Sequence, residues 1–536
     1  MLFNSRRSPV YSTRGIVSTS QPLAAAAGIE ILRNGGNAAD AAVATAAALN
    51  VTEPTSTGIG GDVFCLFYDS KKKKVFGINA SGRAPKALTL DKVRADGFGD
   101  GLPRFHAHTV TVPGAARGWE DTLKRFGTLQ LADVLKPAIN LAKNGYPVSD
   151  LTAMSWSRGA EFQLSNGPYG NEMLLNGKAP RAGELMKIPT LANTFETVAE
   201  HGSVGFYEGR IAEKVIEILK MKGGVMELDD LKEHKSTFED PISVNYHGID
   251  VYEIAPNGQG ITALIALNIL EEFDLESMDP YSSQHLHTLI EAMRIAFADT
   301  RWYVADPSMV DVPINGLLDK NYATSRRKFF NPSRATIDVL KGSPLASSDT
   351  VYLSTADGDG NACSFIASNY MGFGTGLIPQ GCGFTLQNRG HNFSLEPNHP
   401  NVIAPRKRPY HTIIPAMATQ NDELYASFGV MGGFMQPQGH VQVLVNLLDH
   451  KMNPQEALDH PRFCISDGTS DGEVAVEEGY SVSVMSELSN MGHKIVPTSG
   501  SSRQIFGRGQ IIRRNVNSGA LTAGSDSRAD GMAIPL

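Results

Sequence analysis

Thr350 is the residue whose position most favours covalent chemistry. It follows a stretch rich in Ser, Pro and Gly (332–348) and Asp349, and it opens a run typical of a strand (351–356). If the Asp349–Thr350 bond were cut, Thr350 would carry a free α-amine beside its own hydroxyl. Such an amine titrates near neutral pH and can serve as the base for a threonine nucleophile. Threonine also has a high β-propensity and is common in strands, so its position alone is compatible with both a catalytic and a structural role.

Gly432 and Gly433 form a second candidate element. They directly follow a strand-like run (424–430), and two adjacent glycines can present backbone N–H groups to an oxyanion. The same pair is typical of a tight turn. Taken singly, three further polar residues favour structural hydrogen bonding over catalysis: His411, Asp526 and Arg528.

The sequence does not indicate a cofactor. A Gly-rich stretch (372–376) follows a strand, but residues 377–381 break any helix behind it, and no GxxxxGK[ST] motif occurs. The cysteines show neither a Cys-x-x-Cys pair nor a histidine cluster at zinc spacing; they are Cys65, Cys363, Cys382 and Cys464. We therefore expect no metal, no cofactor and no disulfide framework, which fits a reducing compartment.

The elements that must position these residues alternate between helical and strand periods. A helical hairpin is expected first, with Asn34-Gly35-Gly36 ending one helix and Asn37 starting an Ala-rich one that can pack closely. Further helices are predicted over 131–143, 211–222, 261–273, 284–303, 439–448 and 455–458. Strands are predicted over 63–68, 75–79, 242–245, 248–254, 351–356 and 362–370. The fold class is therefore α+β, with helices layered around sheets and a strand-rich C-terminal third.

Charge and hydropathy exclude several partner classes. The 536 residues carry 48 basic and 56 acidic side chains, a net charge of -8, which gives no reason to expect nucleic acid. No apolar run reaches the roughly 18 residues of a membrane span, and residues 1–15 lack a secretory hydrophobic region. We expect a cytoplasmic protein without membrane contacts. The first 29 residues hold no acidic residue, which is typical of a mitochondrial transit peptide, but this alternative is less favoured because structured sequence begins by Gly15.

Several distinctive motifs follow one another along the chain. They include ILRNGGNAADAAV (31–43), EPTSTGIGGD (53–62), EAMRIAFADTRWY from Glu291, and Phe373-Gly374-Thr375-Gly376. With these motifs the chain resembles the γ-glutamyltransferase family, the glutathione hydrolases and their amidase relatives, from Gly15 onward. The resemblance implies an autocatalytically cleaved N-terminal-nucleophile (Ntn) hydrolase with an αββα sandwich.

The resemblance also implies roles for particular residues. The proenzyme would cut itself between Asp349 and Thr350, leaving a large subunit (1–349) and a small subunit (350–536) that share one fold. Thr350 would be the nucleophile, and Gly432 and Gly433 match the family's oxyanion-hole pair. Ser368 stands where the family usually has a threonine that helps to position the nucleophile. Further oligomerisation stays open.

The substrate pocket departs from the family pattern. Ser81 stands where γ-glutamyl enzymes have an arginine for the α-carboxylate, Arg83 lies two residues on, and Asn392 replaces the carboxylate that holds the α-amine. The remaining differences are Arg389, Tyr370, His411 and Thr412. This clamp favours anions, which resembles the amidase branch that includes oxamate amidohydrolase.

The prediction is therefore hydrolysis of a small carboxylate-bearing or γ-glutamyl-like amide through an acyl-enzyme. Val351-Tyr352 follow Thr350, where transpeptidases typically have Thr-His, which favours hydrolysis over transpeptidation. A true glutathione hydrolase is the first alternative. A non-catalytic scaffold relative is the second, and the retention of Thr350 with both glycines argues against it.

Overall fold

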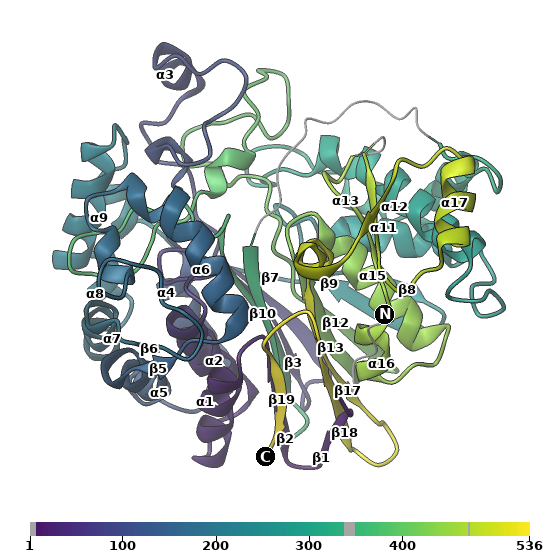
Figure 1. Ribbon diagram of the computed structural model, residues 1–536, viewed down its shortest axis with the longest axis horizontal. Coiled ribbons are helices and arrows are strands. Elements are labelled where there is room, and N and C mark those ends of the chain that lie inside the picture. Colours follow the sequence, from purple (N-terminus) through teal and green to yellow (C-terminus); the bar gives the residue numbers. More distant parts are fainter. Residues whose placement is uncertain (1–6, 337–348, 470–471) are drawn as a thin grey trace.

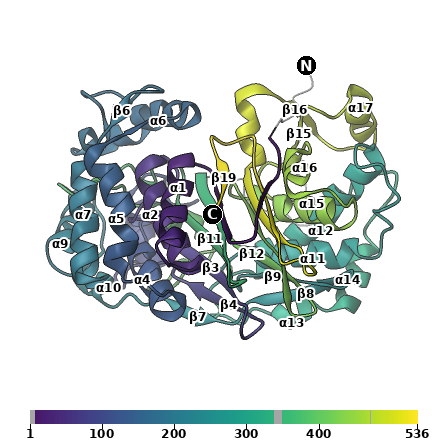
Figure 2. The ribbon, with the colours of Figure 1, turned by 90° about the horizontal axis from the view of Figure 1, so that it is seen from below.

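The computed structural model describes residues 7–336, 349–469 and 472–536. Most of the predicted loop 332–348 therefore lies outside the described residues. Two antiparallel sheets of seven strands pack face to face at the centre, and helices cover the outer face of each sheet (Figures 1 and 2). This arrangement confirms the α+β prediction.

Each sheet combines strands from distant parts of the chain. The first runs in the order β1 (Val10–Ser12), β18 (Leu521–Ser525), β17 (Arg508–Arg514), β13 (Glu423–Met431), β12 (Ala416–Gln420), β9 (Ile249–Glu253) and β8 (Ile242–Tyr246). The second runs in the order β19 (Met532–Pro535), β2 (Gly15–Thr19), β10 (Asp349–Asp357), β11 (Ala362–Tyr370), β3 (Asp62–Asp69), β4 (Lys74–Asn79) and β7 (Thr237–Glu239). The predicted strands 242–245 and 248–254 are thus the edge of a large sheet, and both sheets contain residues from both sides of position 350.

The space between the sheets is filled by apolar side chains with a few buried hydroxyls. Tyr352 and Ile366 of one sheet and Met417 and Ile512 of the other belong to the same core cluster. The strands approach closely at Gly429, where a Cβ would lie 2.6 Å from the ring of Tyr352. A side chain at this position would push β13 away from β10.

The Ala-rich helix behaves as its composition predicts. α2 (Ala38–Thr52) is buried along its whole length, and Asn37 caps it, with its side chain accepting the N–H groups of Ala39 and Asp40. It packs between α1 (Pro22–Arg33), α5 (Leu131–Asn144) and the sheet strands β10 and β11. Small side chains allow this close approach, and larger ones at the same positions would overpack the core.

The other sheet is covered by α11 (Gly260–Leu270), α15 (Met435–Leu448) and α16 (Pro454–Asp459), and α12 (Ser283–Tyr303) packs against α11. α15 begins four residues before its predicted start, directly behind Gly432 and Gly433. A small three-stranded sheet of β14 (Phe463–Ile465), β15 (Val474–Glu477) and β16 (Ile495–Thr498) and the helix α17 (Val482–Asn490) lie beyond these helices. Among the described residues, no helix has the length and apolarity to cross a membrane.

A buried charge network secures the C-terminal strands. Asp526 lies 2.8 Å from Arg462 and 3.0 Å from Arg528, and Arg528 lies 2.5 Å from Glu477. Asp526 also accepts the N–H of Gly509 at 2.8 Å. Burial alone would raise the pKa of Asp526, but the two arginines outweigh it and lower this pKa to about 2. Asp526 and Arg528 are therefore structural in their contacts, as the sequence indicates.

We expect Asp526→Asn to lower the free energy of unfolding by about 3–5 kcal/mol at pH 7, because it leaves two buried guanidinium groups without their shared counter-charge. The exposed pair of Asp133 and Lys136 is the control, and Asp133→Asn should change this free energy by less than about 1 kcal/mol. A carboxylate with a depressed pKa stabilises the fold above its unfolded value and loses this effect as the pH falls through the folded value. The difference between parent and Asp526→Asn should therefore shrink between about pH 4 and pH 2 in urea unfolding, and a constant difference would contradict the network's role.

Candidate active site

Thr350 is buried on the strand pair β10–β11, and its side chain points to Ser368. The Thr350 hydroxyl donates to Ser368 Oγ at 3.1 Å, and Ser368 Oγ accepts the N–H of Tyr370 at 2.8 Å. The register shifts between Asp349, which is opposite Tyr370, and Val351, which is opposite Ala367. Thr350 therefore lies at a β-bulge, a distortion that often re-aims a side chain next to an active site.

The backbone of Thr350 is held by Arg508 of β17. Arg508 Nη2 donates to the Thr350 carbonyl at 3.1 Å and to Ser56 Oγ at 3.3 Å, and Nη1 pairs with the buried Glu53. Burial raises the pKa of Glu53, and Arg508 acts in the opposite direction. Arg508 is opposite Met431 in the sheet register, so it places Thr350 next to the end of β13.

The Gly432-Gly433 pair follows the last residue of β13. Both glycines have positive φ, 136° and 58°, a region that favours glycine. Their carbonyls accept the N–H of Met435 and the side-chain amide of Gln259, respectively. Within the described part of the chain, neither glycine N–H donates a hydrogen bond. Two backbone donors are therefore left for an incoming oxygen.

Arg389 is a buried cation with unused donors. It lies in the short 3₁₀ helix η4 (Arg389–Asn392), and its Nη1 donates to Thr412 Oγ1 at 2.6 Å. Its guanidinium carbon lies 4.4 Å from the ring centroid of Tyr370, and Nη2 has no hydrogen-bond partner. Burial lowers the pKa of Arg389 to about 10, with Asp62 and Tyr370 acting in the opposite direction, so the group is cationic at neutral pH. A buried cation with free N–H groups is suited to an anion.

Asp62 provides the negative charge nearest to this cation. It begins β3 directly opposite Ser368, and its Oδ2 lies 3.9 Å from Arg389 Nε and 3.1 Å from His411 Nε2. Its Oδ1 accepts the N–H of Gly82 at 2.9 Å. Burial and then the charge of Arg389 lower the pKa of His411 to about 3, although Asp62 acts in the opposite direction. His411 is therefore a neutral ring at pH 7.

Tyr370 and Asn392 complete the wall of the candidate site. The Tyr370 hydroxyl donates to Asn392 Oδ1 at 2.6 Å, and Asn392 Nδ2 donates to the Tyr410 carbonyl at 3.2 Å. Burial raises the pKa of Tyr370 to about 12, so it stays a neutral donor. Both ends of the Asn392 amide are thus engaged by the protein.

Two predicted site residues, Ser81 and Arg83, make their hydrogen bonds outside this group. Ser81 is buried and donates to Asn79 Oδ1 at 2.7 Å, while its carbonyl accepts from Arg408 at 3.0 Å. Arg83 is only partly buried and donates to the Lys235 carbonyl at 3.3 Å. Among the described residues, no hydrogen bond or ion pair joins Arg83 to Thr350 or Arg389. The other candidates, Ser368, Tyr370, Arg389, Asn392, His411 and Thr412, form one connected group with Thr350.

Three contributors escaped the sequence analysis. Asp62 is the last residue of the motif EPTSTGIGGD, which also contains Glu53, but no pattern shows that it meets Arg389. Arg508 lies 158 positions from Thr350 and carries no local signal. Gln259 donates to the Thr412 and Gly433 carbonyls, at 2.6 and 2.8 Å, and thereby connects the hydrogen-bond partner of Arg389 to the glycine pair.

Comparison with known proteins shows the family of the chain. The family model described as gamma-glutamyltranspeptidase matches residues 24–536. The glutathione hydrolase-like YwrD proenzyme of Bacillus subtilis (strain 168) is 37% identical, with 98% of this chain and 99% of that protein covered. The oxamate amidohydrolase proenzyme of Klebsiella pneumoniae is 30% identical, with 97% and 98% covered.

A solved structure is also similar over the whole chain. The cephalosporin acylase from Bacillus halodurans has a TM-score of 0.93 and 44% sequence identity, with 100% of this chain and 98% of that chain covered. Fold and relatives thus define an amide hydrolase. The chain belongs to the γ-glutamyltranspeptidase family, as its motifs predict.

We expect Ser368→Ala to lower kcat for amide hydrolysis by roughly ten-fold, because the Thr350 hydroxyl loses one hydrogen bond of about 1–1.5 kcal/mol. Ser364→Ala is the matched control: Ser364 lies on the same strand and is equally buried, but contacts the Tyr352 hydroxyl at 2.8 Å instead. Steady-state kinetics on folded variants gives the comparison. Equal kcat values for the Ser368 variant and the parent would show that this contact does not orient Thr350.

Proposed function

We propose that the chain is an Ntn hydrolase that cleaves itself between Asp349 and Thr350. The four layers seen in Figure 2 would then be the αββα sandwich of that class. The observation that carries the proposal is Thr350: a buried hydroxyl at a bulge, hydrogen-bonded to Ser368, with its carbonyl bonded to Arg508, which is opposite the residue before Gly432. The relatives are named proenzymes, which supports the same interpretation.

The chain could be cut at this bond and keep its fold. β10 has strand neighbours on both sides, β2 from residues 1–349 and β11 from residues 350–536. The other sheet likewise combines β1, β8 and β9 of the first part with β12, β13, β17 and β18 of the second. The two subunits would therefore share both sheets and the core between them.

In the proposed reaction, the free α-amine of Thr350 takes the hydroxyl proton while Oγ1 attacks the substrate amide carbon. The Gly432 and Gly433 N–H groups receive the oxyanion, and Ser368 holds the hydroxyl in the attacking orientation. The proton passes to the amine leaving group, which departs and leaves an ester on Thr350. Water, activated by the same amine, then hydrolyses this ester and releases the acid.

The proposed substrate is a small amide whose acyl part carries a carboxylate. Arg389 supports this assignment because it belongs to the same connected group as Thr350, and its buried Nη2 has no hydrogen-bond partner. Where a γ-glutamyl head would place its ammonium, the pocket offers Asn392 and Tyr370, which are neutral and already bonded to each other. An amide without an α-amine has no ammonium group that would need an anionic partner at this position.

The second candidate is a glutathione hydrolase. Asp62 favours it, because a carboxylate close to Arg389 is a potential partner for an α-ammonium group. Asp62 is, however, already engaged by Gly82 N–H, His411 and the charge of Arg389. A glutathione hydrolase proenzyme of Bacillus subtilis is 31% identical.

Thr350→Ala should abolish both self-cleavage and turnover, whereas Thr350→Ser should retain part of each, because serine keeps the hydroxyl and loses only the methyl that restricts χ1. Denaturing gels of the parent should show fragments of about 38 and 20 kDa, scaled by length from 57.7 kDa. Thr355→Ala is the matched control: Thr355 lies on the same strand, and its hydroxyl bonds the Ala38 carbonyl at 2.6 Å. A single full-length band from active parent protein would overturn the cleavage proposal.

Amides of oxamate type and mono-amides of dicarboxylic acids should be hydrolysed with higher kcat/KM than glutathione or γ-glutamyl anilides. Arg389→Gln should raise KM for these amides by roughly 10- to 150-fold, since one charged hydrogen bond contributes about 1.5–3 kcal/mol. The surface variant Arg406→Gln, which removes an exposed partner of Glu233, is the control. A preference for glutathione, with strong acceleration by glycylglycine, would instead favour the second candidate.

A further inference from the structure

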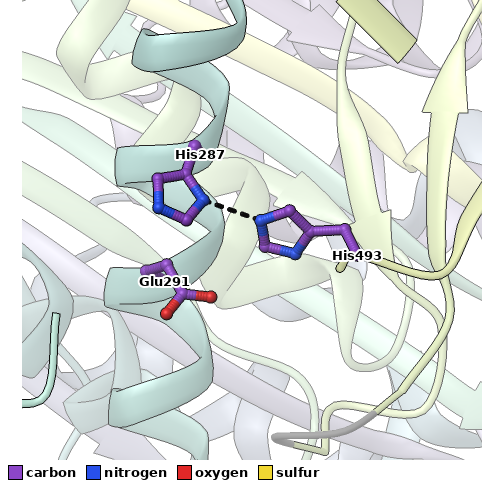
Figure 3. Close-up of side chains that lie close together, drawn as sticks. All are labelled: His287, Glu291 and His493. Atoms are coloured by element: carbon purple, nitrogen blue, oxygen red, sulfur yellow. Dashed lines mark hydrogen bonds between the residues drawn. The ribbon is translucent and has the colours of Figure 1, made fainter. Parts of the chain in front are cut away.

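A cluster of two histidines and one carboxylate lies outside the candidate active site. His287 and Glu291 are four residues apart on α12 and therefore share one face of the helix. His493 comes from the turn between α17 and β16 (Figure 3). All three side chains are buried, and one ligand atom of each lies within 4.8 Å of the others. Among the described residues, no other group of three His, Cys, Asp or Glu side chains is this close.

His287 makes the backbone hydrogen bond that metal-binding histidines usually make. Its Nε2 faces the Asn331 carbonyl at 2.7 Å, so this nitrogen carries the proton, and the lone pair is on Nδ1. Histidines that bind metals usually donate their second ring N–H to a carbonyl or carboxylate in this way. Nδ1 points at His493 Nε2, 2.8 Å away. His493 Nδ1 has no hydrogen-bond partner.

Glu291 presents one oxygen to the protein and one to the cluster. Oε2 accepts the N–H of Thr336 at 2.9 Å, while Oε1 is buried without a hydrogen-bond partner. Arg294 Nε lies 3.9 Å from Oε1, and Arg294 Nη2 donates to the Gly472 carbonyl at 3.1 Å. The arginine compensates the carboxylate charge at a distance and leaves the oxygen's lone pairs open. A fully buried carboxylate oxygen in this state is costly unless a ligand completes it.

We propose that His287 Nδ1, His493 Nε2 and Glu291 Oε1 bind one divalent transition-metal ion of the zinc class, with water in the remaining position. Two imidazoles and a carboxylate form a donor set that Zn²⁺ accepts at about 2.0–2.2 Å. The imidazole nitrogens would move apart by roughly 0.5 Å from their present contact to reach tetrahedral spacing. His493 would shift its proton from Nε2 to the unpartnered Nδ1, so binding releases no proton from this ring.

The charges around the cluster are compatible with reversible binding. The positive charge of Arg294 opposes the cation, so the site tolerates the metal-free state. A bound ion would join α12, the α17–β16 turn and residues 331–336, which His287 and Glu291 already hold through Asn331 and Thr336. This proposal is independent of the nucleophile assignment.

The test uses tag-free, full-length protein that is stripped with a chelator and reloaded with Zn²⁺ or Co²⁺. We expect one equivalent of Zn²⁺ per chain by calorimetry and elemental analysis, and a visible d–d spectrum typical of four-coordinate Co²⁺. Because a ligand that binds only the native state raises its stability, Zn²⁺ should also raise Tm. Glu291→Gln and His493→Gln should each weaken Zn²⁺ binding by at least about ten-fold and abolish the Tm shift.

His450→Gln is the matched control. His450 and His285 form a similar histidine contact, 3.0 Å between their Nε2 atoms, that lacks a carboxylate ligand, so this variant should bind Zn²⁺ as the parent does. A parent protein that takes up less than a fifth of an equivalent overturns the proposal, as does unchanged binding in both ligand variants. The Co²⁺ spectrum of the parent decides the question by itself if a variant fails to fold: an octahedral, water-like spectrum also overturns the proposal.

Discussion

The hydrogen-bonded pairing of β10 with β11 is the constraint on which the candidate active site depends. It fixes the Thr350 hydroxyl 3.1 Å from Ser368, and the same strand β11 pairs with β3 so that Ser368 lies opposite Asp62. β10 also packs on β13 of the facing sheet, where Gly429 leaves room for Tyr352. Any shift of β10 along β11 would therefore move the hydroxyl away from Ser368 and from the end of β13 together.

The electrostatics of the site follow from how few charges are buried beside Thr350. Arg389 is fully buried, its nearest carboxylate Oδ2 is 3.9 Å away, and that carboxylate is shared with His411 and Gly82. This arrangement offsets the desolvation cost of the Arg389 guanidinium only in part, because a buried cation is stabilised most by close bidentate contacts. Under the proposed function, a substrate anion would supply the missing negative charge beside Arg389.

Local sequence patterns predict the local parts of this structure well. β11 has the predicted bounds 362–370, and the Asn37 cap and the burial of α2 follow directly from its composition. β12, β17, β18 and β19 escaped the analysis because their partners are distant: β19 pairs with β2, more than 500 residues earlier. Motifs identify Glu53 and Asp62 as parts of a family signature, yet their partners Arg508 and Arg389 become visible only when the sheets are assembled. The metal-type cluster has the same origin, since His493 meets His287 across 206 positions.

The contacts of Thr350 also bear on how a chain break could be tolerated. Its side chain is held by Ser368 and its carbonyl by Arg508, and Arg508 is fixed in turn by Glu53 and Ser56. None of these contacts uses the peptide bond to Asp349. The register shift lies between Asp349 and Val351, so the regular ladder with β11 begins only after Thr350. Loss of the Asp349–Thr350 bond would thus remove no described side-chain contact of the threonine, and the freed amine would appear beside a hydroxyl that is already oriented.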